Sequence, residues 1–395
     1  METISRKNGI KTKKGELKPP FFMPDATRAF VKSLGIDDLQ KVGVGAMVVN
    51  TYHLYLQPGI ELIKKAGGIN KFMNWEQPLL SDSGGYQVFS LIHKNPKMGK
   101  IKDEKVIFKS PLDGSKHELT PEKSIQIQFD LGVDMMVVLD DCPPNSFSYN
   151  EIKKSVERTV NWARRGMIEY KKQLKVRKIK DEDRPLIFGV IQGGTYLDLR
   201  KECAERLVEI GFSTKGGPAL SWDGLGFGAR HHDENGNLME ELLKFTIGLI
   251  PENYLRFALG VGTPGDIVKC AKMGWDMFDC VIPTREGRHG RLFLWKRNPK
   301  SEILNPKQNI KQKSKLPIAD YELQNSFYET ININNEKFKT DFSPIDPACG
   351  CELCRNYSKA YLRHLFAAKD PLAMRLASIH NLKFYMDLMK SLKSG

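Results

Sequence analysis

The stretch Asp134-Met135-Met136-Val137-Val138-Leu139-Asp140-Asp141-Cys142 shows the pattern that decides the fold: a short apolar run ends directly in polar, chemically capable side chains. The amphipathic segment Ile152–Lys172 follows it. The same pattern then recurs, with Leu186–Ile191 as the apolar run, Gln192-Gly193-Gly194 as its polar end and Tyr196–Ile210 as the next amphipathic segment. Short strands that alternate with helices predict a parallel sheet.

Five further apolar runs fit the same pattern, which brings the number of expected strands to seven: Ala46–Val49, Pro78–Leu80, Gly224–Phe227, Leu255–Leu259 and Met277–Ile282. Polar or glycine-rich residues again follow each run, as in Asn50-Thr51 and Ser81-Asp82. An open sheet gathers its ligands at one switch point, whereas a barrel uses the ends of many strands. The sequence therefore predicts an α/β fold, a (β/α)8 TIM barrel with its site on the C-terminal face.

The composition is that of an ordinary globular protein, with 395 residues of which 41% are hydrophobic and 27% charged. It excludes a wholly disordered chain. No apolar run approaches the roughly 20 residues of a membrane span, and Met1–Lys14 is polar and basic. We expect a soluble, cytoplasmic protein that does not contact membranes.

The charge balance is basic, since Lys and Arg number 61 against 47 Asp and Glu, a formal net charge of +14. This favours a polyanionic partner, although a merely soluble basic protein fits equally well. The segment Lys296–Lys315 holds seven basic residues against one acid, Glu302. It is interpreted either as a solvated loop or as a nucleic-acid contact. We expect three regions: a catalytic barrel at 1–296, a flexible basic insertion at 297–330, and at 331–395 a zinc-binding subdomain with C-terminal helices that complete the barrel.

A metal site is predicted from cysteine spacing. Cys349, Cys351 and Cys354 place three soft ligands within six residues, and His380 or His364 can supply a fourth. Spacing alone does not choose between the two histidines. Three thiolates and one imidazole form a closed, structural zinc set with no open position for a reacting water. We therefore expect one structural Zn²⁺ per chain.

Two carboxylates stand out at strand ends. Asp82 precedes a Gly-Gly turn, and Asp279 lies in the otherwise apolar Met277–Ile282. A carboxylate in such a run is costly unless it is used or paired. Each is either a structural hydrogen-bond anchor or a functional group. Two carboxylates on one barrel rim suffice for glycosyl transfer, with one as nucleophile and the other as acid/base.

Taken together, these motifs resemble the tRNA-guanine transglycosylases (queuine tRNA-ribosyltransferases). The likeness covers roughly Gly9–Lys296 and Ile331–Leu392. The segments that carry it are Phe22-Met23-Pro24, Asn50-Thr51-Tyr52-His53-Leu54, Ala66-Gly67-Gly68, Asp82–Ser90, Leu119-Thr120-Pro121-Glu122, Gly260–Pro264, Phe278–Arg285, the three clustered cysteines and Ser378-Ile379-His380-Asn381. The family is a TIM barrel with a C-terminal zinc site, and its Cys-x-Cys-x-x-Cys…His arrangement favours His380 over His364.

The resemblance implies a pentosyltransferase that exchanges guanine at the wobble position of tRNAs whose anticodon begins G-U for a 7-deazaguanine, preQ1 or queuine. Asp279 matches the nucleophile, which forms a covalent ribosyl-aspartate, and Asp82 matches the general acid/base. The alternatives are a transglycosylase for DNA or for another tRNA position, and a non-catalytic tRNA-binding subunit. The family is commonly homodimeric.

The same resemblance assigns binding residues. The base pocket comprises the side chains of Asp140 and Gln192, Tyr86 as a stacking ring, Cys142 beside the base, and the backbone of Gly228 and Ala229. Arg285 and Arg288 match residues that contact the anticodon loop, which arginine reads through its planar donor fork. Without the resemblance, Asp140 and Asp141 also fit a metal pair, and Cys142 fits a buried apolar position.

One segment departs from the family pattern. Bacterial relatives carry Gly-Gly-Leu-(Ala or Ser)-Val-Gly-Glu where this chain has Gly228-Ala229-Arg230-His231-His232-Asp233-Glu234. That loop helps to recognise the substituent at position 7 of the base. The departure leaves open which 7-deazaguanine is accepted. The histidine pair is interpreted as part of an exposed charged loop rather than as a metal site.

Overall fold

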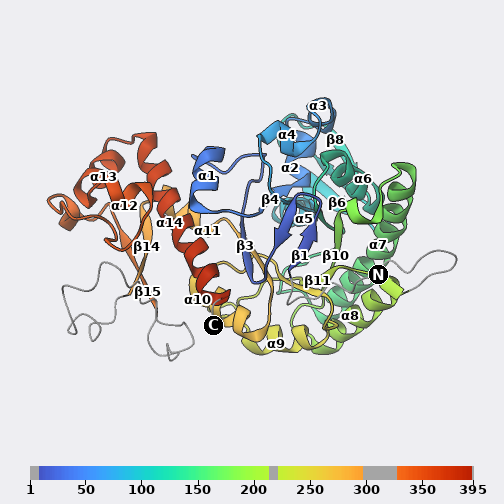
Figure 1. Cartoon of the computed structure of the whole chain (residues 1–395). Helices are drawn as coiled ribbons and strands as arrows, with labels where there is room; N and C mark the ends of the chain where they lie inside the picture. The colour runs from blue at the N-terminus through green and yellow to red at the C-terminus, as the bar shows by residue number, and fades with distance from the viewer. Residues whose placement is uncertain (1–8, 213–220, 297–326, 394–395) are drawn as a thin grey trace. The chain divides into compact units, whose positions relative to one another are not determined.

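The computed structural model describes residues 9–212, 221–296 and 327–393 (Figure 1). Contacts divide the chain into two compact units. The barrel unit comprises Met1–Phe30, Gly45–Val261 and Cys270–Asp279. The C-terminal unit comprises Val31–Val44, Gly262–Lys269 and Cys280–Gly395. Of the predicted insertion at 297–330, residues 297–326 lie outside the described residues, and these include all of the basic segment after Lys296.

Eight strands form the barrel sheet, in the order β3-β13-β12-β11-β10-β9-β5-β4. They are β3 (Phe21–Pro24), β4 (Met47–Asn50), β5 (Leu79–Asp82), β9 (Met135–Val137), β10 (Leu186–Ile191), β11 (Gly224–Phe227), β12 (Leu255–Ala258) and β13 (Met277–Cys280). A parallel backbone bridge between Asp25 and Val48 joins the two ends of the sheet. The predicted α/β barrel is confirmed, and the seven predicted runs coincide with β4, β5 and β9–β13.

The eighth strand, β3, was not among the predicted runs. It is only four residues long, and Pro19, Pro20 and Pro24 flank or end it. Proline removes a backbone donor, so such a run does not read as a central strand. Tertiary pairing nevertheless holds it in the sheet, because the Phe21 N–H donates to the carbonyl of Asp276 at 2.9 Å.

The barrel interior is filled by inward-facing apolar side chains. This cluster comprises Ile10, Leu17, Phe21, Met23, Ala46, Val48, Leu80, Met135, Val137, Leu186, Phe188, Val190, Leu255, Phe257 and Met277. Because side chains on a strand alternate between its two faces, the next inward position lies two residues further on. Those positions are Asp25, Asn50, Asp82, Leu139, Gln192, Leu259 and Asp279. A mostly polar layer, which we call the mouth layer, therefore closes the apolar core at the C-terminal ends of the strands.

The N-terminal ends of the strands carry a different set of carboxylates. Asp134, Asp223 and Asp276 accept the backbone N–H groups of Leu79, Ile187 and Arg256 at 3.0, 2.8 and 3.0 Å. Each bond joins neighbouring strands, and Arg184 also binds Asp223 through two nitrogens at 2.7 Å. These carboxylates are satisfied by the scaffold, so this end of the barrel serves stability.

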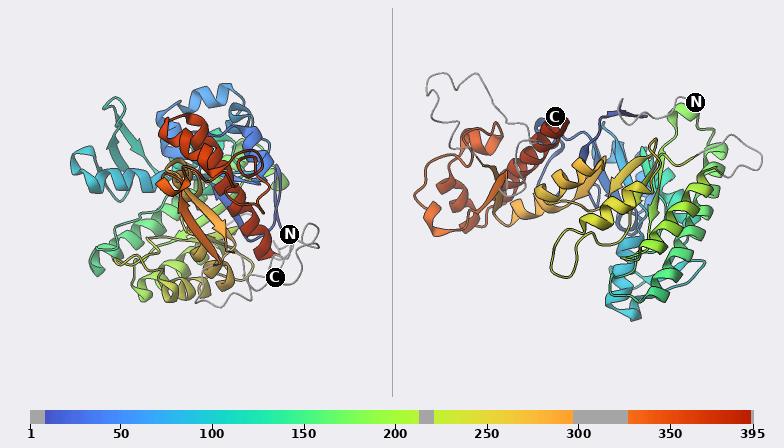
Figure 2. Two further views of the ribbon diagram at one scale, coloured as in Figure 1. Left: turned by 90° about the vertical axis from the view of Figure 1, so that its left-hand side faces the viewer. Right: turned by 90° about the horizontal axis from the view of Figure 1, so that it is seen from below.

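Helices surround the strands in the barrel unit, and α7 and α8 lie side by side outside them (Figure 2). The helices with bounds in or reaching into this unit are α2 (Thr51–Leu56), α3 (Ile60–Lys65), α4 (Ile69–Met73), α5 (Gly85–Lys94), α6 (Pro121–Leu131), α7 (Tyr149–Val176), α8 (Leu197–Phe212), α9 (Glu240–Gly248) and α10 (Pro264–Met273). Their ends follow local chemistry. The Thr120 hydroxyl caps α6, and Ser148 with Glu151 forms a capping box on α7.

Two small antiparallel sheets complete the barrel unit. The hairpin of β1 (Ile10–Thr12) and β2 (Gly15–Leu17) contributes Ile10 and Leu17 to the core cluster. A three-stranded sheet of β6 (Gly99–Ile101), β7 (Val106–Lys109) and β8 (Lys116–Leu119) is inserted between α5 and α6.

The C-terminal unit is built on the long helix α14 (Pro371–Lys393), which packs on α11 (Ile282–Arg288). At their contact a Cβ on Gly287 would lie 2.9 Å from backbone atoms of α14, so only glycine allows this approach. The other elements are α1 (Ile36–Val42), β14 (Arg291–Trp295), β15 (Tyr328–Asn332), α12 (Glu352–Asn356) and α13 (Lys359–Ala367). β15 pairs with β14 and includes residues 328–330, which end the predicted insertion. In the described parts of the chain, no helix has the length and apolar character needed to cross a membrane.

Candidate active site

Asp82 is the last residue of β5, and its side chain belongs to the mouth layer. Its Oδ1 accepts the backbone N–H groups of Thr51 at 3.0 Å and Gly84 at 3.1 Å. Its Oδ2 accepts the side-chain amides of Asn50 at 2.5 Å and Gln87 at 3.3 Å. Asn50 also caps α2 through its Oδ1, so one residue fixes both the helix start and the carboxylate. The Asp82 carboxylate is therefore fixed by four donors, two from the end of the neighbouring strand β4 and the start of α2, and two from the turn and helix that follow β5.

Asp279 lies one residue before the end of β13 in the same layer. One described donor holds it, the backbone N–H of Gly260 at 2.9 Å from Oδ1. Burial raises the pKa of Asp279 to about 7, and the charge of Asp25 raises it further. Burial also raises the pKa of Asp82 to about 7, with the charges of Asp25 and Asp279 acting in the same direction. Such a pair can share one proton at neutral pH, leaving one group as an acid and the other as an anion.

Asp140 and Gln192 meet on the β9–β10 side of the mouth. Gln192 Nε2 donates to Asp140 Oδ2 at 2.7 Å, and both side chains are buried. Burial raises the pKa of Asp140 to about 6. The buried Gln192 Oε1 has no hydrogen-bond partner among the described residues. A buried acceptor of this kind is costly unless a ligand supplies a donor.

The alternative of a metal pair at Asp140 and Asp141 is not supported. The Asp141 carboxylate is turned to Arg158, whose guanidinium donates to it, whereas Asp140 is turned to Gln192. The two carboxylates thus have separate partners.

The remaining pocket residues lie close to Gln192. A Cβ on Gly228 would stand 2.4 Å from Gln192 Nε2, so the backbone here runs directly against the amide. Ala229 takes a positive φ of 87°, an unusual conformation for alanine. Burial raises the pKa of Cys142 to about 12, so its thiol stays neutral. Tyr86, in the first turn of α5, is 54% exposed. The structure thus brings Gln192, Asp140, Cys142, Gly228 and Ala229 together and leaves the Tyr86 ring accessible.

Arg200 supports this pocket and was not singled out from the sequence. It is fully buried in α8, and its guanidinium donates to the carbonyls of Gly194 and Gly228, both at 2.8 Å. Its guanidinium also lies over the Phe227 ring, 4.2 Å from the centroid. One side chain therefore ties together the ends of β10 and β11. In the sequence it is an ordinary arginine of an amphipathic helix, so no local signal marks it.

The loop at 228–234, which differs from the family pattern and is called the departing loop below, is held by hydrogen bonds within it and just beyond it. Asp233 accepts the backbone N–H groups of Asn235 and Asn237 at 2.9 and 2.8 Å. Arg230 has an exposed side chain, and its carbonyl accepts from Asn145 Nδ2 at 3.4 Å. The His231 and His232 rings lie 4.3 Å apart, and both residues are half-buried.

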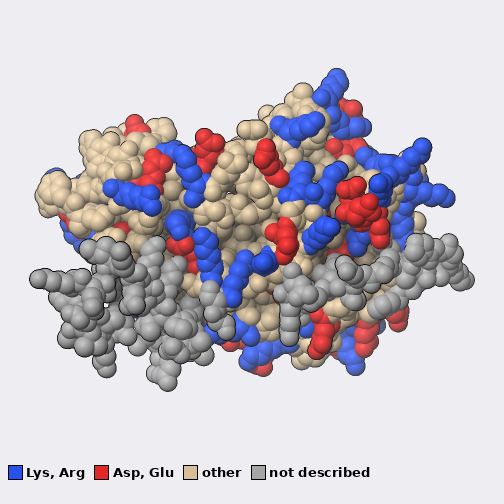
Figure 3. Space-filling model, in the orientation of Figure 1, with Lys and Arg blue, Asp and Glu red and all other residues tan. Residues whose placement is uncertain are grey.

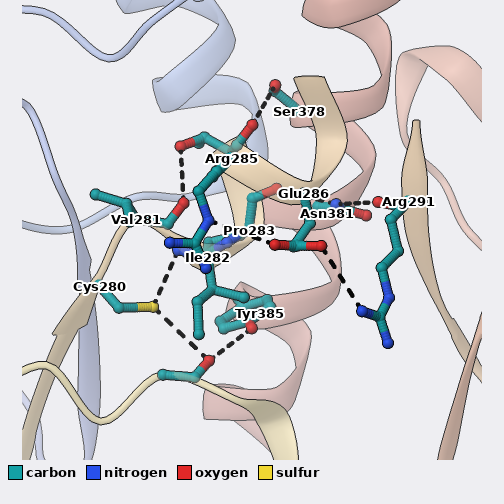
Figure 4. A network of polar contacts seen from close by, with 12 residues as sticks. Cys280, Val281, Ile282, Pro283, Arg285, Glu286, Arg291, Ser378, Asn381 and Tyr385 are labelled. Carbon is teal, nitrogen blue, oxygen red and sulfur yellow. Dashed lines mark hydrogen bonds and ion pairs between the residues drawn. The ribbon is translucent and has the colours of Figure 1, made fainter. Parts of the chain in front are cut away.

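The predicted RNA-contacting arginines, Arg285 and Arg288, belong to α11 of the C-terminal unit, and Figure 4 shows Arg285 with its neighbours. Arg285 is half-exposed, and its Nε lies 3.4 Å from Glu286 Oε1. Asn381 fixes the helix from α14, donating to the carbonyls of Pro283 and Arg291, both at 2.9 Å. Burial and the charge of Arg285 lower the pKa of Arg288. On the face drawn in Figure 3, Lys and Arg are interspersed with acidic residues, so charge alone does not outline an RNA footprint there.

The predicted metal ligands converge in the C-terminal unit. The ligand atoms of Cys349, Cys351, Cys354 and His380 all lie within 4.8 Å of one another, so the cluster can hold one metal ion. His380 Nδ1 is 3.6 Å from Cys351 Sγ and 3.3 Å from Cys354 Sγ. A tetrahedral zinc with ordinary bond lengths needs N–S edges of about 3.6 Å. His380 Nε2 lies 2.8 Å from the Phe293 carbonyl, an outer hydrogen bond that leaves Nδ1 for the metal.

The choice of His380 over His364 is confirmed by this geometry. His364 is exposed on α13 and does not join the cluster, whereas His380 is 1% exposed. The donor set fits a structural zinc ion with all four positions filled by protein.

Comparison with known proteins shows the family of the chain. The family model described as queuine tRNA-ribosyltransferase matches residues 3–395. A queuine tRNA-ribosyltransferase of Halothermothrix orenii is 40% identical over 395 residues, covering 100% of this chain and 91% of the relative. Those of Caldanaerobacter subterraneus and Listeria innocua are each 41% identical, over 393 and 394 residues, covering all of this chain and 90% and 89% of the relatives. The chain belongs to the queuine tRNA-ribosyltransferase family.

Proposed function

We propose that this protein is a pentosyltransferase that exchanges guanine at the anticodon wobble position of tRNA for a 7-deazaguanine. The observation that carries the proposal is the presence of two half-buried carboxylates with raised pKa values, Asp82 and Asp279, in the mouth layer, together with the acceptors of Asp140 and Gln192. The names of the relatives support the same reaction.

In the proposed reaction, a carboxylate oxygen of Asp279 attacks C1′ of the target nucleotide. The glycosidic C–N bond breaks, and its electron pair leaves with guanine, which takes a proton from Asp82. The ribosyl-aspartate ester is then attacked by the ring nitrogen of the incoming 7-deazaguanine. That nitrogen loses its proton to Asp82, and the Asp279 carboxylate is released. No phosphodiester bond is broken, and both carboxylates return to their starting states.

The hydrogen bonds of the two carboxylates suit these roles. Asp82 is held at both oxygens, as is expected of an acid/base group that must keep its position through both half-reactions. Asp279 has one described donor, so its other oxygen is available to the substrate. Asp140 and Gln192 Oε1 supply acceptors for the N–H groups of a guanine-like edge, which a dry pocket needs for selection of one purine.

The proposal is tested by incorporation of labelled guanine into a tRNA anticodon stem-loop that begins G-U. We expect exchange with the RNA stem-loop, none when the wobble base is adenine, and none with a matched DNA hairpin. Exchange with the DNA hairpin alone, or tRNA binding without exchange, would instead establish one of the alternative functions.

Replacing Asp82 by asparagine is expected to lower the turnover of guanine exchange by at least about 10²-fold, the scale of a lost general acid. Affinity for tRNA should stay within a few-fold of wild type, because Asn fills the same volume. Single-turnover exchange and filter binding measure the two effects separately. A loss confined to binding would remove Asp82 from the chemistry.

The same variant should change stability in the opposite direction. Because burial raises the pKa of Asp82 from 3.8 to about 7, the folded state keeps a proton that the unfolded state releases. The contribution of this group to the free energy of unfolding is therefore fully present below about pH 4, and it is lost as the pH rises to about 7 and the folded state must also release the proton. Asp82→Asn should raise the melting temperature at pH 8 and should gain little at pH 4. An equal shift at both pH values would contradict this assignment.

Arg230 tests the departing loop. If its cation faces the substituent of the base, it repels a cationic aminomethyl group and favours a neutral nitrile or a cyclopentenediol. The side chain is exposed and only its carbonyl has a described partner, so we expect Arg230→Leu to change the ranking of the three bases by less than about 3-fold. Relative kcat/KM values for the three bases decide the matter. A larger gain for the aminomethyl base would assign Arg230 to substrate selection.

We also propose that the protein is a cytoplasmic homodimer in which Arg285 and Arg288 contact the anticodon loop. An exposed aromatic surface in the C-terminal unit supports self-association. The Tyr357 and Tyr361 rings stack at 5.2 Å beside Phe342, which is 80% exposed. Light scattering should give a dimer mass for wild type and a monomer mass for Tyr361→Ala. A monomeric wild type at micromolar concentration would contradict the dimer.

A further inference from the structure

Asp25 is a third carboxylate of the mouth layer. It follows β3, and the alternation from Phe21 and Met23 turns its side chain into the barrel. Its backbone bridges to Val48 and so closes the sheet. Because β3 was not predicted, Asp25 was not expected among the residues at the C-terminal ends of the strands.

Asp25 lies near both proposed catalytic carboxylates. Its charge raises the pKa of Asp82 and that of Asp279. The carboxylate is half-buried, and burial raises its own pKa. In the described part of the chain, only the cysteine–histidine cluster groups its ligand atoms tightly enough for a metal ion. A shared cation therefore does not account for Asp25.

Thr27 fixes one oxygen of this carboxylate and leaves the other. The Thr27 backbone N–H and hydroxyl both donate to Asp25 Oδ1, at 2.7 and 2.5 Å. No described residue donates a hydrogen bond to Oδ2. Thr27 therefore fixes the orientation of this half-buried carboxylate through Oδ1, and Oδ2 can accept a hydrogen bond from a ligand.

The order of the strands indicates which part of the substrate this oxygen meets. Around the barrel, β3 lies four strands from β10 in either direction. The base pocket is built on β9, β10 and β11, with Asp140, Gln192 and Gly228. Asp279, the proposed nucleophile at C1′, is on β13, the neighbour of β3. With the base on the β10 side and C1′ at Asp279, the ribose lies on the side of β3.

We propose that Asp25 is a specificity-determining residue that accepts a hydrogen bond from the 2′-hydroxyl of the target nucleotide. Within a tRNA chain the 3′ and 5′ oxygens of each ribose are phosphodiesters, so the 2′-hydroxyl is the one donor that this sugar offers. It is also the group that distinguishes RNA from DNA, and bonds to it strengthen as positive charge develops at the sugar. The inference rests on the proposed transglycosylase function.

The test compares two anticodon stem-loops that differ only by 2′-deoxyguanosine at the wobble position. The measured quantity is the ratio of kcat/KM for guanine exchange on the ribo and deoxy substrates. The deoxy sugar alters intrinsic reactivity equally for every variant, so the change of this ratio between variants isolates the contact. We expect Asp25→Ala to lower the ratio by about 10- to 100-fold relative to wild type.

Two further variants separate the contact from charge and folding. Asp25→Asn removes the charge but keeps an acceptor oxygen. Its ribo-to-deoxy ratio should therefore lie closer to that of wild type than the ratio of Asp25→Ala does. Thr27→Val removes one donor to Oδ1 and should lower the ratio by a smaller factor, and it serves as the test if Asp25→Ala does not fold. Melting temperatures and tRNA binding report folding for each variant.

The outcomes are distinct. Equal slowing of both substrates in Asp25→Ala and Asp25→Asn, with an unchanged ratio, would mean that Asp25 acts only through its charge and would overturn the inference. An unchanged ratio in Thr27→Val, where Asp25→Ala does not fold, would overturn it as well. Failure of the wild-type protein to exchange guanine on the ribo substrate would instead reject the proposed function.

Discussion

Asp279→Ala is expected to abolish guanine exchange, with a turnover loss of at least about 10³-fold, because the variant lacks the carboxylate oxygen that the proposal assigns to the ribosyl ester. Wild type incubated with tRNA and then denatured should show a protein–RNA band of covalent adduct. The variant should lack this band and should still bind tRNA within a few-fold of wild type.

Asp82→Asn is the matched control for this experiment. It removes a carboxylate from the same layer but leaves Asp279 in place, so the adduct should form slowly rather than not at all. Normal exchange by Asp279→Ala would reject the nucleophile assignment. An adduct of undiminished yield in that variant would place the covalent bond on another residue.

Loss of the metal ligands should have the largest effect on stability. Cys351 and the α14 residue His380 are almost wholly buried, and a structural zinc stabilises a fold by many kcal/mol because the unfolded chain holds no preformed site. Elemental analysis of the purified protein should give one zinc per chain. Cys351→Ser should lose the metal and lower the melting temperature by about 10 °C or more.

His364→Ala is the matched control for the metal site. It removes a histidine of the same unit that is exposed and outside the cluster, so zinc content and melting temperature should match wild type. Metal-free wild-type protein of full stability would contradict a structural role for the cluster. Zinc loss in His364→Ala would contradict the assignment of His380.

Local sequence was sufficient for much of the barrel. A buried parallel strand reads as a continuous apolar run, and the polar residues that follow it are adjacent in the chain, as in Asp134–Cys142. The three cysteines were visible for the same reason, because six residues hold all of them. The strand ends Asp82, Asp140, Gln192 and Asp279 could thus be named before their surroundings were known.

Tertiary structure decided the features that depend on residues far apart in the chain. β3 is a strand because Phe21 and Asp25 pair with β13 and β4, although its prolines argue against one locally. Because β3 could not be predicted locally, Asp25, which follows it, was not expected in the layer that holds Asp82 and Asp279. Hydrogen bonding and burial, which set the two raised pKa values, likewise come from neighbouring strands. Apolar periodicity encodes where strands end, whereas only packing determines which side chains then share one low-dielectric space.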